Sequence, residues 1–584
     1  MTERETAQGA NGVVVAGHPL ATEAGLEILR RGGNAVDAGV AAGIALNAAH
    51  HDMTSFSGVA PILIHLAGTG ESRSFDGLGR WPRAASLEWF WENQDGRYEP
   101  NLRHCVLPGA ASSWISALRR FGTLSFAEVA EAAIRVCEEG VEIAPFQAGI
   151  FARNEESLLR WPGSRAVVGA PGGGLLQAGD IMRQPDHAET LRRLAAAEKS
   201  AGGSREDKIE AAHAAFYEGE AAEKMVRFSD EHGGFFTRED FAEFRAAEEP
   251  PIRVAFEGHE LVGCGPWCQG PVLLEAVSIL KNFDLRALGH NSPAYLHLIT
   301  CALLLAYADR EAHVGDPGFV DVPIEEMLSE EYTRARAGLI ETGRAFEGMP
   351  PPGDPVSGKP LLEGYEMPRP GNWETNRGLE RGAAVQWTAD TSYVGVVDGQ
   401  GNMFSATPSD TLGSHLEPPL IPGLGLALSG RGRQSRLDPR HPAAIAPGKR
   451  PRLTPNPALV LKDGAPAFVF GTPGGDVQPQ AMLQVFLNLL VFGMEPQAAV
   501  EAPRLASYSF PNSFYPHDYF PGLLCIESRV GEKTLAALEA MGHKVEAWPE
   551  SIPKAGSVLV AGLRKGGLWR GAADHRRLAT ARAL

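Results

Sequence analysis

Two segments in the final third of the chain read strand, turn, strand, and this pattern limits the possible folds most. Residues 391–410 read TSYVGVVDGQGNMFSATPSD, with β-branched residues on both sides of a glycine-rich turn. Residues 456–475 read NPALVLKDGAPAFVFGTPGG, with an Asp-Gly turn between two apolar runs. Such runs, bounded by turn dipeptides, are typical of β-hairpins. The sequence therefore predicts a β-rich module that begins at Thr391.

The position of Thr391 at the head of the first hairpin has two interpretations. In the first, Thr391 simply begins a buried strand, which β-branched residues favour. In the second, the chain is cut after Asp390 and Thr391 becomes an N-terminal nucleophile. A threonine hydroxyl is a weak nucleophile at neutral pH and needs a nearby base. A free α-amine, with a pKa of about 8, would supply that base without a histidine.

The segment before Thr391 differs in composition from the hairpins. Residues 343–388 are rich in Gly, Pro and charged residues and lack apolar periodicity. We therefore expect an exposed, flexible linker that leads to Thr391. The sequence thus predicts two parts: a helix-rich part from 1 to 390 that ends in this linker, and a catalytic part from 391 to 584.

Helix patterns dominate the residues before the linker. Residues 21–49 predict two helices, with Gly32 and Gly33 ending the first and Asn34 capping the second. Apolar residues recur at helical spacing in residues 126–140, 187–200 and 292–316. Residues 200–210 are polar and predict a loop.

The second hairpin ends in GTPGGD, residues 471–476, which also has two interpretations. A strand that ends in two glycines can present consecutive backbone N–H groups without obstruction by side chains. This arrangement suits an oxyanion hole, in which one donor contributes about 3 kcal/mol to transition-state stabilisation. Alternatively, Gly474 and Gly475 only form a tight turn, since glycine pairs are common in loops.

Charge and motif content argue against several function classes. The formal net charge of −17 disfavours nucleic acid or an anionic membrane as the partner, because both require concentrated Lys and Arg. A secretory signal and an apolar run of about 18 residues are both missing, so we expect a cytoplasmic protein without a membrane span. The six scattered cysteines predict buried side chains. The histidines lack zinc-binding spacing, so neither a metal nor another cofactor is expected.

An ordered series of segments over nearly the whole chain resembles one family. The series includes EILRRGGNAVDAGVA, VLPGAASSWISALRRFGTLSFAEV, ADREAHVGDPGFV, TSYVGVVDGQGN, APGKRPRLTPNPALVLKDG and FGTPGGD. Together these segments resemble the γ-glutamyltransferases (glutathione hydrolases), which are N-terminal-nucleophile hydrolases. Several of the segments are long and specific, and they occur in the order found in the family.

The resemblance implies a fold and a set of catalytic roles. The expected fold is an α+β, four-layer αββα sandwich, made as one precursor that cleaves itself between Asp390 and Thr391. Thr391 would be the nucleophile and, through its amine, the base. Ser409 would orient the nucleophile, and Gly474 and Gly475 would donate the oxyanion hydrogen bonds. The products would be a large subunit, 1–390, and a small subunit, 391–584; the resemblance permits, without requiring, a homodimer of such heterodimers.

The sequence departs from the family where the γ-glutamyl group is bound. The family holds the α-carboxylate with an arginine before a proline. Alignment on Pro82 puts Leu78 at that position, with Arg80 two residues away. The family's asparagine shortly after the orienting hydroxyl is replaced by Asp410 or Thr411.

The family's ammonium-binding acid and serine pair are also replaced. Arg431 or Arg433 stands where the acid is expected, and the serine pair becomes Leu-Thr at 453–454. An arginine in a partly desolvated pocket disfavours an ammonium and attracts an anion. A different loop register would instead let Asp438 or Asp410 supply the acid. The candidate substrate-binding residues are Arg80, Asp410, Arg431, Arg433 and Thr454.

Three hypotheses follow for the function. The first is an autoprocessed hydrolase or acyltransferase that cleaves γ-glutamyl amides such as glutathione, with water or an amine as acceptor. The second is an amidase or acylase for a different, carboxylate-bearing acyl group, as in the family's cephalosporin-acylase-like and oxamate-hydrolase-like branches. The third is an unprocessed relative that binds small amides without catalysis. Each of them implies a small-molecule amide as the ligand.

Overall fold

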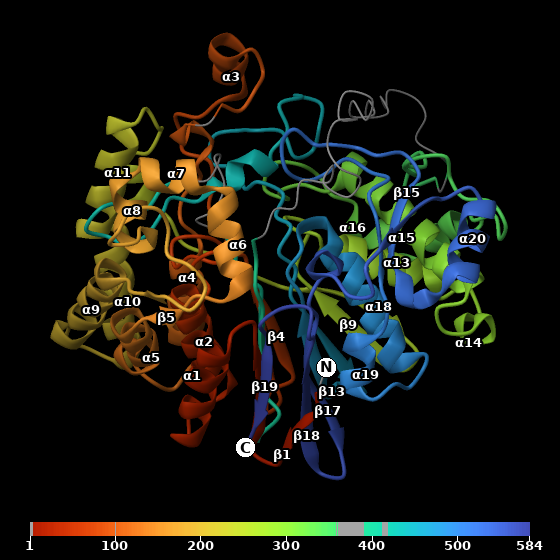
Figure 1. The fold of residues 1–584 in the computed structure, drawn as a ribbon, viewed down its shortest axis with the longest axis horizontal. Helices are drawn as coiled ribbons and strands as arrows, with labels where there is room; N and C mark the ends of the chain where they lie inside the picture. Colours follow the sequence, from red (N-terminus) through yellow and green to blue (C-terminus); the bar gives the residue numbers. More distant parts are fainter. Residues whose placement is uncertain (1–3, 100, 358, 360–389, 411–417) are drawn as a thin grey trace.

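Two antiparallel β-sheets of seven strands each lie face to face, and helices cover the outer side of both (Figure 1). The computed structural model describes residues 4–99, 101–357, 359, 390–410 and 418–584 of the 584-residue chain. The arrangement is helix, sheet, sheet, helix. The expected four-layer αββα sandwich of the N-terminal-nucleophile type is therefore confirmed.

The strands of each sheet come from distant parts of the chain. The first sheet has the order β1 (Ala7–Gly9), β18 (Leu568–Ala573), β17 (Leu559–Lys565), β13 (Ala465–Gly471), β12 (Ala458–Lys462), β9 (His259–Gly263) and β8 (Ile252–Phe256). The second has the order β19 (Thr580–Ala583), β2 (Gly12–Ala16), β10 (Val394–Asp398), β11 (Met403–Ala406), β3 (Ile62–Leu66), β4 (Glu71–Phe75) and β7 (Glu248–Glu249). Both predicted subunits thus contribute strands to both sheets.

One helical layer packs on each sheet. On the second sheet these helices are α1 (Pro19–Arg30), α2 (Ala35–Ala49), α4 (Ala110–Phe121), α5 (Phe126–Glu139), α9 (Pro185–Ser200) and α10 (Arg205–Tyr217). On the first sheet they are α13 (Gly270–Leu280), α15 (Pro293–His313), α17 (Glu330–Ala337), α18 (Gln478–Leu490), α19 (Pro496–Glu501) and α20 (Glu532–Ala540). Figure 1 shows α1, α2 and α5 on one side of the sheets and α13, α15 and α18 on the other.

The remaining elements lie around these four layers. The further helices are α3 (Leu87–Gln94), α6 (Pro145–Arg153), α7 (Glu155–Arg160), α8 (Pro162–Val168), α11 (Glu220–Glu231), α12 (Arg238–Ala242), α14 (Leu285–Leu288) and α16 (Ile324–Met327). Two small sheets contain β14 (Leu505–Ser507), β15 (Leu523–Glu527) and β16 (Lys544–Trp548), and β5 (Val141–Glu142) with β6 (Ile181–Met182).

Side chains of the second sheet alternate between two apolar cores. On β2, Val13 and Val15 face the first sheet, whereas Val14 and Ala16 face the helices. This alternation follows from the two-residue period of a β-strand. Both faces of β2 are therefore buried, and this strand is apolar throughout.

Both hairpins and the first helix pair form as the sequence predicts. The first hairpin is β10–β11, and the second is β12–β13. Asn34 caps α2 and forms a reciprocal capping box with Asp37. Local turn and cap chemistry is sufficient to define these elements.

Two expectations about loops were wrong in part. The predicted loop at 200–210 ends at Ser204, which forms a capping box with Asp207 and starts α10 at Arg205. The first part of the predicted linker is packed rather than exposed: Met349 is only 3% exposed and belongs to a hydrophobic core. The Gly353 N–H also donates to a carboxylate of α15 at 2.7 Å. Residues 358 and 360–389 of that linker lie outside the described residues.

Candidate active site

The first hairpin brings two hydroxyl groups together beyond the open end of its two strands. Val394 pairs with Ala406, so residues just before β10 and just after β11 lie side by side. The Thr391 hydroxyl is 2.6 Å from the Ser409 hydroxyl, and both side chains are buried. The predicted nucleophile and the predicted orienting residue are thus hydrogen-bonded to each other.

The backbone of Thr391 is strained. Its φ is +81°, in the left-handed region that β-branched residues avoid. Residues held in such regions cost about 1–3 kcal/mol each. The Thr391 amide N–H donates to the Met53 carbonyl oxygen at 2.8 Å, and only 1% of the residue is exposed. Burial and these hydrogen bonds hold the strained residue in place.

Arg431 connects the predicted cleavage site to the hydroxyl pair. Its guanidinium donates to Asp390 at 2.6 Å and to Asp410 at 2.7 Å, and it also contacts the Ser409 hydroxyl. The Thr391 hydroxyl donates to the other carboxylate oxygen of Asp390 at 3.0 Å. One buried guanidinium therefore holds two carboxylates beside the nucleophile.

Asp410 is the second strained residue of the site. Its φ is +86°. Burial raises the pKa of Asp410 above its ordinary value, and the charge of Arg431 and the Ser429 hydroxyl oppose that rise. The carboxylate is therefore already engaged by a cation and a hydroxyl in the uncut chain.

The glycine turn follows β13, which packs against the start of β10. A Cβ atom at Gly471 would lie 2.3 Å from the Tyr393 ring, so only glycine lets the two strands approach this closely. Tyr393 is two positions after Thr391, and this contact brings the turn toward the nucleophile. Gly474 and Gly475 have φ values of +129° and +57°. The predicted turn thus exists, with positive φ values that favour glycine, and its role as an oxyanion hole stays a prediction.

The other predicted substrate-binding residues are spread over three places. The Thr454 hydroxyl accepts from Gln434 at 2.8 Å, next to the short helix that carries Arg431. The Arg433 guanidinium carbon lies 6.0 Å from the Phe514 ring centre. Arg431 lies over the same ring at 5.3 Å.

The Arg80 guanidinium carbon lies 5.7 Å from the ring centre of Phe244, and the Arg80 carbonyl oxygen accepts from the Leu107 N–H. The neighbouring Val106 donates its N–H to the Ser429 carbonyl oxygen, and the Ser429 hydroxyl donates to Asp410. The role of Arg80 in substrate binding stays a prediction.

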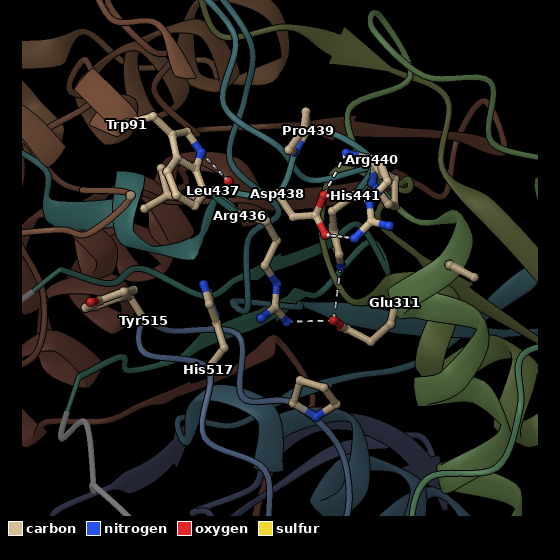
Figure 2. Close-up of a pocket in the computed structure, with 14 residues that line it drawn as sticks. Trp91, Glu311, Arg436, Leu437, Asp438, Pro439, Arg440, His441, Tyr515 and His517 are labelled. Atoms are coloured by element: carbon tan, nitrogen blue, oxygen red, sulfur yellow. Dashed lines mark hydrogen bonds and ion pairs between the residues drawn. The ribbon is translucent and has the colours of Figure 1, made fainter. Parts of the chain in front are cut away.

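A cavity of about 710 Å³ is lined in part by the segment that follows Arg433 (Figure 2). Tyr515, one of its lining residues, donates its backbone N–H to the Arg433 carbonyl at 3.0 Å. The Trp91 indole N–H donates to the Leu437 carbonyl at 2.9 Å across the mouth of the cavity. The cavity is lined by Trp91, Gly96, Glu311, Ala312, Arg436, Leu437, Asp438, Pro439, Arg440, His441, Pro442, Pro511, Tyr515 and His517.

The charged groups of this cavity are paired with one another. Figure 2 shows Arg436 and His441 directed at Glu311, and Arg440 directed at Asp438. Burial alone would raise the pKa of Glu311, but the surrounding arginines outweigh it and hold that pKa well below its usual range. Burial lowers the pKa of His441 to about 4, so the ring is neutral. Asp438 is therefore part of the cavity and not of the Thr391 group.

Sequence reasoning missed the residues that fix the glycine turn. The Gln269 side chain donates to the carbonyl oxygens of Gly475 and Thr454, at 3.4 and 3.3 Å. Arg310 of α15 donates to Asp476, the last residue of GTPGGD, at 2.6 Å. A buried Arg in a strongly apolar helix was the available signal, since such a charge requires a partner.

Among the described residues, no group of three or more His, Cys, Asp or Glu side chains is arranged to hold a metal ion. No helix in the described part of the chain is both long and apolar enough to span a bilayer. All six cysteines are buried, as their scattered positions predict.

Known proteins resemble the chain along its length. The family model described as "Gamma-glutamyltranspeptidase" matches residues 21–584. The acylase ACY 1 proenzyme of Pseudomonas sp. (strain SE83) is 32% identical over 561 residues, covering 94% of this chain and 89% of that protein. The glutathione hydrolase-like YwrD proenzyme of Bacillus subtilis (strain 168) is 28% identical over 573 residues, covering 97% of each.

A solved structure extends the likeness to the fold. A cephalosporin acylase from Bacillus halodurans has a TM-score of 0.82 and 28% identity, covering 100% of this chain and 98% of that one. The sequence resemblance is thus confirmed across both predicted subunits. The chain belongs to the γ-glutamyltranspeptidase family.

Proposed function

We propose that the protein cleaves its own chain between Asp390 and Thr391 and then hydrolyses or transfers the acyl group of a small amide. The observation that carries this proposal is the position of the Thr391 hydroxyl. It is buried between the Ser409 hydroxyl, at 2.6 Å, and the Asp390 carboxylate, at 3.0 Å. A hydroxyl next to the bond to be cut, with a proton acceptor in contact, is the arrangement that self-cleavage requires.

Self-cleavage would proceed through an ester. The Thr391 oxygen attacks the carbonyl carbon of Asp390 while the hydroxyl proton passes to the Asp390 carboxylate. The C–N bond breaks, the nitrogen takes that proton and becomes the Thr391 α-amine, and an Asp390–Thr391 ester remains. Water hydrolyses this ester, which frees the hydroxyl and leaves a carboxylate at the end of the first fragment.

Backbone strain supports cleavage at this bond. The φ of +81° at Thr391 exists only while the preceding peptide bond is intact. Cutting the bond removes that dihedral and releases the strain, which is about 1–3 kcal/mol for a residue in such a region. The two relatives named above are both described as proenzymes, and this agrees with a cut precursor.

The cut protein would treat an external amide in the same way. The Thr391 oxygen attacks the amide carbonyl, and the new α-amine takes its proton and passes it to the leaving amine. The N–H groups of Gly474 and Gly475 would stabilise the oxyanion. Water or an amine then accepts the acyl group from the Thr391 ester.

A γ-glutamyl amide is the first candidate substrate. The family to which the chain belongs and the glutathione hydrolase-like relative both favour it. Asp410, close to the hydroxyl pair, is the residue that would have to receive the substrate's ammonium. It is already ion-paired with Arg431 at 2.7 Å.

An acyl group with a carboxylate but no ammonium is the second candidate. The observation that favours it is Arg431, a buried cation 2.6 Å from the carboxylate that precedes the cut. A buried guanidinium repels an ammonium and binds a carboxylate through paired hydrogen bonds. The named acylase relative and the cephalosporin acylase structure agree with this candidate.

Two measurements test the proposal. A denaturing gel of the purified 62.4 kDa chain should show two fragments, and a Thr391→Ala variant should show one. The p-nitroanilides of γ-glutamate and of glutarate should then separate the two candidates, since they differ only in the ammonium. A wild-type chain that remains whole and hydrolyses neither anilide would contradict the proposal.

A further inference from the structure

We infer that Asp390 acts as a built-in substrate mimic: before cleavage its carboxylate fills the position at Arg431 that a carboxylate of the substrate's acyl group takes afterwards. This inference rests on the proposed function, because the position is vacated only if the chain is cut at Thr391. The inference also predicts the chain length of the preferred acyl group, and it assigns Arg431 as the residue that selects this length.

The chemistry of the two reactions places both acyl groups on the same atom. Self-cleavage joins the acyl carbon of Asp390 to the Thr391 oxygen, and turnover joins the substrate's acyl carbon to that oxygen. In an aspartyl group, two carbon atoms separate the acyl carbon from the carboxylate carbon. A succinyl group has the same spacing, whereas glutaryl and γ-glutamyl groups have three intervening carbons. The structure therefore favours succinyl amides.

The contacts of Arg431 show what cleavage changes. In the uncut chain Nη2 donates to Asp390 at 2.6 Å, while Nε donates to Asp410 at 2.7 Å. Only 1% of Arg431 is exposed, so water replaces a lost carboxylate poorly. When Asp390 leaves with the first fragment, the contacts to Asp410 and to the Ser409 hydroxyl remain, and the contact between Nη2 and the Asp390 carboxylate is broken. An incoming carboxylate restores it.

A second cation faces the same carboxylate. Burial lowers the pKa of Arg577 to about 10, and the negative charges of Asp390 and Asp52 oppose that shift. Loss of Asp390 therefore removes negative charge from the surroundings of the buried Arg431 and the partly buried Arg577. An acyl group with an ammonium would add positive charge there instead, so γ-glutamyl amides should be poorer substrates than succinyl amides.

A binding experiment tests the inference without turnover. Titration calorimetry compares succinate with succinamide, which has the same length but no charge, on two proteins: cut wild type and uncut Thr391→Ala. Cut wild type should bind succinate at least about tenfold more tightly than succinamide, and the uncut variant should bind neither. Equal binding of both ligands by cut wild type would overturn the inference. Binding of succinate by the uncut variant as tight as by the cut protein would overturn it as well.

A kinetic experiment identifies the residue. Succinyl p-nitroanilide is compared with its methyl ester, and Arg431→Lys is compared with a matched variant, Arg73→Lys, at a partly exposed arginine of β4. Arg431→Lys should lower kcat/KM for the succinyl substrate by roughly 30-fold or more relative to the ester, the size expected when one partner of a buried charge pair is altered. Arg73→Lys should leave that ratio unchanged.

The outcomes separate this inference from the proposed function. A chain that is cut and hydrolyses the succinyl and methyl ester substrates equally well keeps the proposed function and overturns the inference. A higher kcat/KM for the glutaryl than for the succinyl anilide overturns the predicted length. If Arg431→Lys is not cut, two measurements still test the inference: the wild-type kcat/KM values for succinyl p-nitroanilide and its methyl ester, and the calorimetry.

Discussion

Arg310 on α15 donates to the Asp476 carboxylate at 2.6 Å, and both side chains are buried. Asp476 ends the GTPGGD motif, and it also accepts the backbone N–H of Ser513 at 2.7 Å. The predicted large subunit therefore fixes the turn through which the predicted small subunit would bind the oxyanion.

Asp476→Asn should lower kcat by about 100-fold, because misaligned oxyanion donors cost about 3 kcal/mol of transition-state stabilisation. KM should change little, since the substitution touches the transition-state contacts and not the acyl pocket. The matched variant is Glu495→Gln, which alters an exposed carboxylate paired with Lys565 and should leave kcat unchanged. Equal kcat values for Asp476→Asn and wild type would show that the glycine turn held by Asp476 does not contribute to catalysis.

Ser409→Ala should slow self-cleavage by roughly fivefold or more, because the buried hydrogen bond to Thr391 contributes about 1 kcal/mol or more. Ser409→Thr keeps the hydroxyl and should cleave at close to the wild-type rate. The measurement is the time course of the two fragments on a denaturing gel after synthesis of the precursor. Cleavage of the alanine variant at the wild-type rate would show that Ser409 does not orient the nucleophile.

Gly471→Ala should destabilise the protein by about 1–3 kcal/mol, because its methyl group would overlap the Tyr393 ring. The displacement of Tyr393 should also slow self-cleavage, since Thr391 is two positions away. Gly68→Ala is the matched control: a Cβ atom there meets nothing within 4 Å, and its effect should stay within about 0.5 kcal/mol. Urea unfolding of both variants measures the difference.

Asp52 should make the stability of the uncut protein depend on pH. Burial raises the pKa of Asp52 to about 7. The folded state then binds more protons than the unfolded state between about pH 4 and pH 7, so stability falls as pH rises through this window. In the uncut Thr391→Ala background, Asp52→Asn should flatten the decrease in Tm between about pH 4 and pH 7. An exposed control, Asp95→Asn, should show the same dependence of Tm on pH as the Thr391→Ala parent. Identical slopes of Tm against pH for all three proteins would show that Asp52 does not titrate in this range.

The elements with local signals could be predicted from the sequence, and so could the parts of the site that they position. Hairpins β10–β11 and β12–β13 are defined by their turns, and α2 by its Asn34 cap. Because Thr391 and Ser409 flank one hairpin, their contact follows from the pairing of two strands. Local chemistry alone thus brings these two hydroxyls together.

The remaining parts of the site depend on contacts between distant segments. Arg310 and Asp476 are brought together by the packing of α15 against the glycine turn, which no local pattern encodes. The same is true of Met349, whose burial in a segment rich in Gly and Pro comes from tertiary packing. The prediction for Arg80 was made from sequence alignment, whereas its position depends on how the chain packs around Phe244.

N-terminal sequencing of the purified, active protein tests the central claim most directly. The account predicts a fragment that begins Thr-Ser-Tyr-Val, which starts at Thr391, in an amount equal to the first fragment. Full amide hydrolysis by a chain that is intact at this bond, or one cut elsewhere, would contradict it.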